Sequence, residues 1–285
     1  MNGFINVIKP VGATASDVVV CLKHILGERK VGHLGTLDPG ASGVLSVAVG
    51  YGTKLFDFLT NKVKIYRAFF TFGRTTDTLD SYGDITDVTN TIPSVEQLQT
   101  VLNGFTGEFD QVPPIYSSKS VGGVRAYKLA RNGVNVELKA RKIVIYDIRL
   151  VAQKSDDTFI LDIICGGGTY IRSIARDVAE KLNTVAYMSG LIRLKSGAFE
   201  IGDAYTLDEI RELKDKCVLD IMYPLDDVAE YRFDDRLFDD IDCGRAVECP
   251  FKEGYRKIYC KGVFFGLGKN VDGKLKIAYY LKKAY

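Results

Sequence analysis

The chain has 285 residues, of which 46% are hydrophobic, and its formal net charge is +2. This length and composition allow one large core or two domains. No apolar run reaches the roughly 18 residues that a membrane-spanning helix requires, so we expect no membrane span. The six cysteines form no Cys-x-x-Cys pair and the N-terminus does not resemble a secretory signal, which favours a reduced, cytoplasmic protein without structural zinc.

The small net charge conceals three segregated blocks. Residues 119–142 contain seven basic residues and one acidic residue, a balance of +6, and residues 251–285 contain nine and two, a balance of +7. Between them, residues 203–248 contain fifteen acidic and six basic residues, a balance of −9. The two basic blocks predict two surfaces for a polyanion such as a nucleic acid, and ordinary solvated surface charge is the alternative for either block.

The first elements in the chain are short. Residues 4–8 predict a strand that ends in a turn at Pro10, and Ser16 is the predicted N-cap of a helix. A second strand is predicted over residues 44–49, followed by a short helix that carries Lys54. Lys54 is a candidate phosphate contact, and a solvated lysine is the alternative.

Residues 32–45 form a glycine-rich stretch between these elements. It contains four glycines, a histidine, and a lone carboxylate, Asp38, followed by Pro39. Proline disfavours the helical region for the residue before it, and glycine permits backbone conformations that other residues avoid. We therefore expect Asp38 on a constrained loop at the start of a strand, where reactive groups are commonly found. A turn or cap role is the alternative for its carboxylate.

The middle of the chain predicts a buried strand and a polar loop. Residues 64–72 are almost continuously apolar and aromatic, and strand alternation places Tyr66 on one face and Arg67 on the other. A tyrosine in such a strand is by default a core residue. Residues 73–83 form a loop rich in Thr and Asp, and a capping box starts a helix over residues 94–102.

Residues 107–142 differ in character from the rest of the chain. They are rich in Lys and Arg, with scattered apolar residues and no clear period, and a short basic helix is predicted over residues 125–131. We interpret this segment as a mobile arm that becomes ordered on binding RNA, with an ordinary surface loop as the alternative. Its candidate RNA contacts are Lys119, Arg125 and Lys128.

The second half of the chain predicts strands over residues 141–151 and 158–165, then an amphipathic helix over residues 170–182. Arg172 and Arg176 fall outside the apolar stripe of that helix. A strand pair over 188–199 and a capped helix over 206–213 follow. Beyond Pro224 the pattern changes to short strands separated by Gly, Asp and Asn, which predicts a small β-barrel. We place the domains at residues 1–228 and 229–285.

A glycine turn precedes the helix at 170–182. Residues 166–168 are all glycine, and such a turn at a helix start is able to hold a phosphate. The turn lacks both the P-loop lysine and the dinucleotide fingerprint, so a nucleotide-cofactor enzyme is a remote alternative.

Five segments, in order along nearly the whole chain, carry a resemblance to a known family. The stretch HLGTLDPGASGVL resembles the motif of the TruB family of RNA pseudouridine synthases that carries the aspartate nucleophile. The other segments resemble the family's N-terminal motif, its tyrosine strand and loop, its arginine helix and its pocket-closing strand. In this chain they read NVIKPVG, KIYRA with GRTTDTLD, GTYIRSI and LIRL.

The resemblance implies a fold and an activity. The fold is α+β, a mixed and largely antiparallel sheet flanked by helices, with a small C-terminal β-barrel that resembles a PUA RNA-binding domain. The activity is isomerisation of a uridine in RNA to pseudouridine, without a cofactor, after the base has flipped out of its stack. The arm at residues 107–142 resembles that of the stand-alone bacterial enzymes, which implies a monomer without an obligatory protein partner. The implied substrate is the uridine at position 55 of the tRNA T-arm.

The resemblance also implies roles for residues. Asp38 would attack the nucleotide, at C1′ of the ribose or at C6 of the base, and Arg172 would orient it and keep it ionised. Tyr66 would stack on the flipped uracil and serve as the base that removes the C5 proton. His33 would occupy the space that the flipped base leaves. The pocket would be lined by Tyr170 and Leu194. A non-catalytic RNA-binding or tRNA-folding protein of the same fold is the alternative function.

Overall fold

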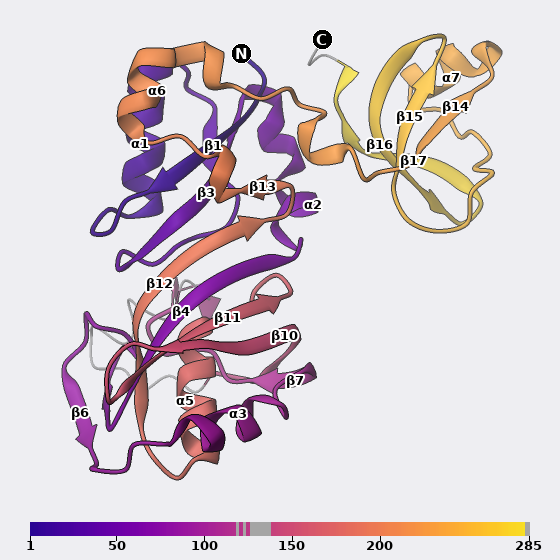
Figure 1. Ribbon diagram of the computed structural model, residues 1–285. Coiled ribbons are helices and arrows are strands. Elements are labelled where there is room, and N and C mark those ends of the chain that lie inside the picture. The colour runs from indigo at the N-terminus through magenta and orange to yellow at the C-terminus, as the bar shows by residue number, and fades with distance from the viewer. Residues whose placement is uncertain (118–119, 122–123, 126–137, 283–285) are drawn as a thin grey trace.

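The computed structural model describes residues 1–117, 120–121, 124–125 and 138–282, with only the backbone at residues 120–121 and 124–125. The described part forms a large mixed sheet with helices and a smaller C-terminal sheet domain beside it (Figure 1). The predicted α+β fold class is confirmed. None of the described helices is long and apolar enough to cross a membrane.

The large sheet orders its strands as β1-β3-β12-β4-β11-β10-β7, with β2 and β13 paired at its margins. Neighbouring strands are antiparallel except β3 and β12, which run parallel. Figure 1 shows β12 and β4 as the long central strands that join the two halves of the sheet. The bounds are β1 (Gly3–Lys9), β2 (Val31–His33), β3 (Ala41–Val49), β4 (Lys64–Phe72), β7 (Gly107–Gln111), β10 (Arg141–Gln153), β11 (Thr158–Cys165), β12 (Ala186–Ser196) and β13 (Phe199–Glu200).

Helices cover the sheet at each end. α1 (Ala15–Leu26) and α6 (Leu207–Leu213) pack with β1 and β3 around one apolar cluster, and α3 (Val95–Leu102) and α5 (Ile171–Lys181) pack with β4 and β11 around another. Thr14, rather than Ser16, is the N-cap of α1, because its side chain and that of Asp17 form a capping box. The remaining short elements are η1 (Gly50–Leu55), α2 (Phe56–Thr60), β5 (Arg74–Thr76), β6 (Ile85–Val88), η2 (Ile201–Asp203), η3 (Lys214–Cys217) and η4 (Tyr223–Leu225).

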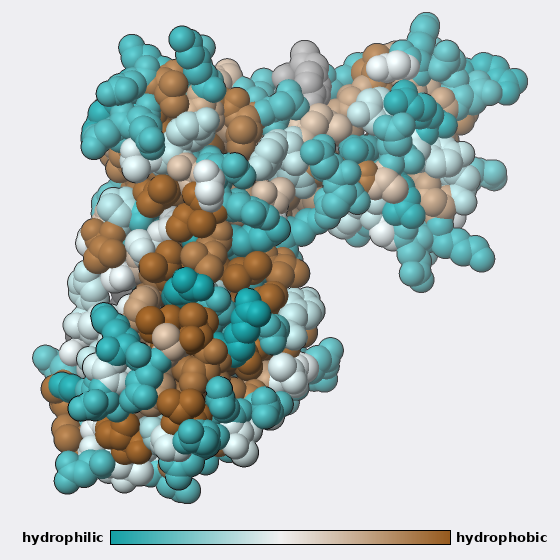
Figure 2. All heavy atoms as spheres, in the orientation of Figure 1, coloured by the Kyte–Doolittle hydropathy of each residue, from teal (hydrophilic) through white to brown (hydrophobic). Residues whose placement is uncertain are grey.

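The C-terminal sheet domain has the strand order β14-β15-β16-β17. An apolar cluster that contains both Leu55 and Leu267 joins it to the large sheet. Figure 2 shows hydrophobic residues gathered over the strands of the large sheet, whereas the visible face of the C-terminal domain is mostly hydrophilic. The elements are β14 (Glu230–Phe233), η5 (Asp235–Leu237), α7 (Phe238–Asp242), β15 (Arg256–Cys260), β16 (Val263–Val271) and β17 (Lys274–Tyr280).

The predicted arm at residues 107–142 is only partly described. Both of its ends belong to the large sheet, because β7 pairs with the first residues of β10. Between them, β8 (Ser120–Val121) pairs with β9 (Val124–Arg125), so Arg125 lies in a strand and not at the start of the predicted helix. Lys119, Lys128 and the rest of that helix lie outside the described residues.

Candidate active site

Asp38 lies on the loop between β2 and β3, which we call the Asp38 loop (residues 34–40). The N–H of Ala41 donates to the carbonyl of Asp38 at 3.0 Å, which closes a turn around Pro39. In the first residues of β3, a Cβ atom on Gly43 would lie 2.3 Å from the carbonyl oxygen of Arg193 on β12. Gly43 also has φ +98°, so glycine is required for β3 to begin this close to β12.

A buried arginine holds this loop from the side of the sheet. Arg193 on β12 is fully buried and donates to the carbonyl oxygens of Gly35 at 3.2 Å, Thr36 at 3.3 Å and Val44 at 2.7 Å. Three backbone carbonyls before and after Asp38 are therefore fixed by one guanidinium. A buried charge is tolerated here because its donors meet these acceptors.

The end of β1 and the turn that follows it also hold the Asp38 loop in place. Lys9, also fully buried, donates from Nζ to the carbonyls of Pro10, Ala13 and Pro39. The N–H of Gly12 donates to Pro39 at 2.9 Å. Burial lowers the pKa of Lys9 to about 8, although the charge of Asp38 acts in the opposite direction.

Arg172 reaches Asp38 from the first turn of α5. Its Nε lies 2.9 Å from Oδ2 of Asp38, its Nη1 donates to the carbonyl of Thr78 at 2.8 Å, and its Nη2 donates to that of Tyr116 at 3.1 Å. A second carboxylate, that of Asp80, lies 3.5 Å from Nη1. The guanidinium is 6% exposed and the Asp38 side chain 35% exposed, so the arginine is fixed while the carboxylate remains accessible.

This burial differs from the sequence interpretation of Arg172. The residue lies outside the apolar stripe of the helix, yet it is buried because the loop carrying Thr78 and the chain at Tyr116 close over it. The side chain of Gln111, at the end of β7, bonds both the N–H and the carbonyl of Tyr170 and so fixes the start of α5. Arg172 is thus positioned by contacts from several distant segments.

Tyr66 lies within the electrostatic reach of Asp38. It sits on β4 opposite Arg193 of β12 and is 6% exposed, on the face that packs with α5. Burial raises the pKa of its hydroxyl; the adjacent guanidinium of Arg193 lowers that pKa, and the charge of Asp38 raises it further. Asp38 and Arg172 are therefore in contact, and Tyr66 lies close enough to Asp38 for the carboxylate charge to act on its hydroxyl.

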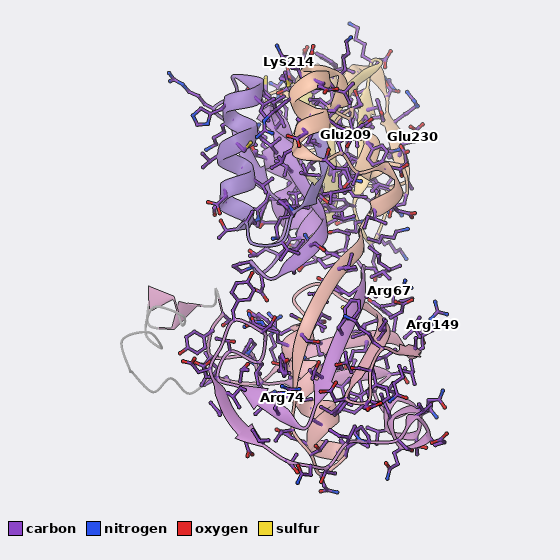
Figure 3. The ribbon with its side chains drawn as sticks, turned by 60° about the vertical axis from the view of Figure 1, so that its left-hand side comes forward. Arg67, Arg74, Arg149, Glu209, Lys214 and Glu230 are labelled. Carbon is purple, nitrogen blue, oxygen red and sulfur yellow. The ribbon has the colours of Figure 1, made fainter. Side chains whose placement is uncertain are left out.

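Arg67, the next residue on β4, projects on the opposite face. It forms a two-point ion pair with Asp162, at 2.8 Å and 2.9 Å, and Arg149 lies 4.0 Å from the same carboxylate. Figure 3 shows Arg67 and Arg149 projecting on the same side of the sheet. The alternation predicted for β4 is confirmed.

His33, Tyr170 and Leu194, the residues expected in the pocket, lie at the end, the N-cap and an irregularity of their respective elements. His33 ends β2 half-buried, and burial, followed by the charge of Arg193, lowers its pKa, so the imidazole is neutral at neutral pH. Its Nδ1 has no hydrogen-bond partner within the described part of the chain.

Tyr170 is the N-cap of α5, and its ring lies 4.9 Å from the guanidinium carbon of Arg141. Leu194 lies at an irregularity in the pairing of β12 with β4, where a bulge re-aims a side chain.

Lys54 lies away from this group. It follows β3, at the opposite end of that strand from Asp38, and its Nζ donates to the carbonyl of Tyr280 at 2.9 Å. The same Nζ lies 4.7 Å from the centre of the Tyr51 ring. Lys54 therefore links the C-terminal domain to the large sheet, and the structure does not bring it to Asp38.

Sequence reasoning assigned no role to Asp80, Arg193 or Lys9, which the structure places around the Asp38 loop. A signal was present for two of them. Arg193 lies within the apolar run LIRL of β12 and Lys9 ends the largely apolar β1, and a cation in a buried strand needs specific acceptors. Asp80 gave no such signal, because it is one of several acids in a polar loop.

Neither a metal cluster nor a phosphate-binding turn stands out among the residues that the structure describes. Among the described residues, no group of three His, Cys, Asp or Glu side chains is placed to hold a metal ion. In the turn at 166–168, a Cβ on Gly167 would lie 2.7 Å from the Cα of Asn61, and one on Gly168 would lie 2.6 Å from the Arg141 guanidinium. These glycines are needed for close packing, which accounts for them without a bound phosphate.

The fold matches that of known pseudouridine synthases. The structure superposes on a chain in the crystal structure of a Cbf5-Nop10-Gar1 complex with a TM-score of 0.74, covering 96% of this chain and 83% of that one at 24% identity. A second match, in an H/ACA RNP bound to a substrate RNA containing 2′-deoxyuridine, has a TM-score of 0.71 at 22% identity, with 94% and 78% covered. The likeness defines the class of fold: the pseudouridine synthase fold.

Sequence comparison places the chain more narrowly. Residues 23–171 match the profile described as TruB family pseudouridylate synthase (N terminal domain). The chain is 38% identical over 97% of its length to tRNA pseudouridine synthase B of Clostridium perfringens, covering 98% of that protein. It is 44% identical to the protein of the same name from Caldanaerobacter subterraneus, with 75% of each covered. The chain belongs to the TruB family of pseudouridylate synthases.

Proposed function

We propose that this protein is a tRNA pseudouridine synthase that isomerises the uridine at position 55 of the T-loop, with Asp38 as its nucleophile. One observation carries the proposal: an accessible carboxylate on a glycine- and proline-constrained loop is paired at 2.9 Å with a buried arginine, and its charge acts on the hydroxyl of Tyr66. Relatives that align with almost the whole chain are named tRNA pseudouridine synthase B.

The reaction rearranges one nucleotide and consumes no other reactant. The bond from N1 of uracil to C1′ of ribose breaks, the base turns, and a bond from C5 to C1′ forms. The proton leaves C5 and a proton is taken up at N1, so substrate and product are isomers. Asp38 forms the transient covalent bond, at C1′ or at C6, and leaves when the new glycosidic bond has formed. Extrusion of the base from the stack costs about a few kcal/mol.

The surrounding residues position and assist this carboxylate. Arg172 holds Asp38 with a charge-assisted contact and orients the carboxylate for attack as the nucleophile. Tyr66 stacks on the extruded uracil and accepts the C5 proton. Burial raises the pKa of its hydroxyl, and the neighbouring Arg193 guanidinium acts in the opposite direction. Neutral His33 fills the space of the extruded base without adding a charge.

The RNA is held by the basic part of the arm and by the pocket walls. Lys119, Arg125 and Lys128 contact phosphates of the T-arm, which suits their basic surroundings in the sequence. Tyr170 and Leu194 line the pocket and keep water from the broken glycosidic bond. The protein acts as a monomer without an obligatory protein partner.

The test uses the full chain and an unmodified T-arm stem–loop. We expect Asp38→Asn and Asp38→Ala to form no pseudouridine while they bind the RNA about as tightly as the wild type. Asp208→Asn is the matched control, because Asp208 also pairs with an arginine, Arg211, but on the exposed surface of α6. Normal product formation by either Asp38 variant would exclude this residue as nucleophile. Tight binding by a wild type that makes no product would favour a non-catalytic tRNA-binding protein.

A further inference from the structure

Tyr82 is an exposed aromatic residue beside the Asp38 loop that the proposed mechanism does not use. The residue is 61% exposed. A Cβ atom built on Gly40 would lie 2.6 Å from Cε2 and 3.0 Å from Cδ2 of Tyr82, so the edge of the ring lies against the backbone of Gly40. Gly40 is two residues from Asp38. An open aromatic ring therefore lies against the loop that carries the accessible carboxylate.

The backbone of Tyr82 is tied to the ion pairs of the site. Its N–H donates to Oδ1 of Asp80 at 3.0 Å, and Oδ2 of Asp80 lies 3.5 Å from Nη1 of Arg172. Arg172 in turn pairs with Asp38 at 2.9 Å. The ring and the carboxylate are thus held in one connected network.

The loop that carries Tyr82 is anchored at its base as well. The hydroxyl of Thr76 donates to the carbonyl of Asp80 at 2.7 Å, and the N–H of Met188 on β12 donates to the carbonyl of Leu79 at 3.0 Å. A ring that is already positioned loses little conformational freedom when a ligand stacks on it. The loop therefore holds the backbone of Tyr82 in position before a ligand binds at the site.

We propose that Tyr82 is a substrate-positioning residue on which an unpaired RNA base, adjacent to the extruded uridine, stacks. This inference rests on the proposed function, which requires a single-stranded loop to lie across Asp38. Unpaired RNA bases are characteristically bound by aromatic side chains, because every base offers a π face. A side chain whose task was only to cover Gly40 would need no exposed ring.

Three substitutions separate stacking from simple cover. Tyr82→Phe retains the ring, Tyr82→Leu retains apolar cover of Gly40 without a ring, and Tyr82→Ala removes both. We expect the dissociation constant for the T-arm stem–loop to rise about five- to hundredfold for the Ala and Leu variants, the range that loss of one base stack produces. The Phe variant should stay within about twofold of wild type. Tyr146→Ala, which removes an aromatic residue on β10 with 55% exposure, is the matched control and should bind normally.

The fluorescence of a modified base gives a second measurement. It should not change if Tyr82 has only a structural role. With 2-aminopurine beside the target uridine, stacking on Tyr82 quenches fluorescence, and Ala and Leu variants should lose this quenching at saturating protein. Binding by the Ala variant within about twofold of wild type, or wild-type behaviour of the Leu variant, would overturn the proposal. Both measurements report binding alone, so they remain decisive for Tyr82 even if the wild type forms no pseudouridine.

Discussion

Replacement of Arg172 by lysine tests whether geometry, beyond charge, positions Asp38. The arginine serves Asp38, the carbonyl of Thr78 and the carbonyl of Tyr116 through three different nitrogens, at 2.9, 2.8 and 3.1 Å. Lysine keeps the positive charge but carries one nitrogen on a flexible stem, which cannot occupy these three positions. At least one of the contacts must be lost.

The size of the effect follows from the contact that is lost. A hydrogen bond to a charged group contributes about 1.5–3 kcal/mol, and each 1.4 kcal/mol or so of transition-state stabilisation is worth about tenfold in rate. If the ammonium remains with the buried carbonyls, Asp38 loses its partner and its orientation. We therefore expect Arg172→Lys to lower the rate of pseudouridine formation about ten- to hundredfold, while RNA affinity changes little, because Arg172 is only 6% exposed.

The assay measures single-turnover conversion with excess enzyme. The signal is the release of tritium from C5-labelled uridine in the T-arm RNA. Arg176→Lys is the matched control: Arg176 lies one turn later in α5 and pairs with Asp177 and Glu180. A rate for Arg172→Lys within twofold of wild type would refute the reasoning. It would show that a positive charge alone is sufficient at this position.

Two further variants test the surroundings of the site. Asp80→Asn removes the second carboxylate near Arg172, at 3.5 Å, and should lower the single-turnover rate about tenfold without weakening RNA binding; an unchanged rate would show that the backbone carbonyls hold the arginine unaided. Lys64 is buried, and this burial lowers its pKa from 10.5 to about 8. Between these values the unfolded chain binds more protons at Lys64 than the folded chain, so stability rises with pH, by up to about 1.4 kcal/mol per pH unit. Urea unfolding from pH 8 to pH 10 should therefore show wild type gaining stability relative to Lys64→Met, and a constant difference would contradict this assignment.

Local sequence determined the elements that carry the site. The proline and glycines around Asp38 predicted a constrained loop, because they restrict or widen backbone conformation whatever the fold. Alternation along residues 64–72 assigned Tyr66 and Arg67 to opposite faces, which the structure confirms. The cap of α1 was misplaced by two residues, since Thr14 and Ser16 are both good caps and only the capping box with Asp17 distinguishes them.

Only the tertiary structure decided how these elements meet. The burial of Arg172 outside the apolar stripe of its helix depends on the chain at Thr78 and Tyr116, which helical periodicity does not register. The clamp of Arg193 on the Asp38 loop requires β3 and β12 to lie parallel and adjacent, a pairing between segments far apart in sequence. For Lys54 the local sequence indicates a candidate phosphate contact, but in the folded chain its Nζ donates to a carbonyl of the C-terminal domain. Conformational preferences act between near neighbours, whereas buried charges take their partners from whatever the folded chain brings within hydrogen-bond distance.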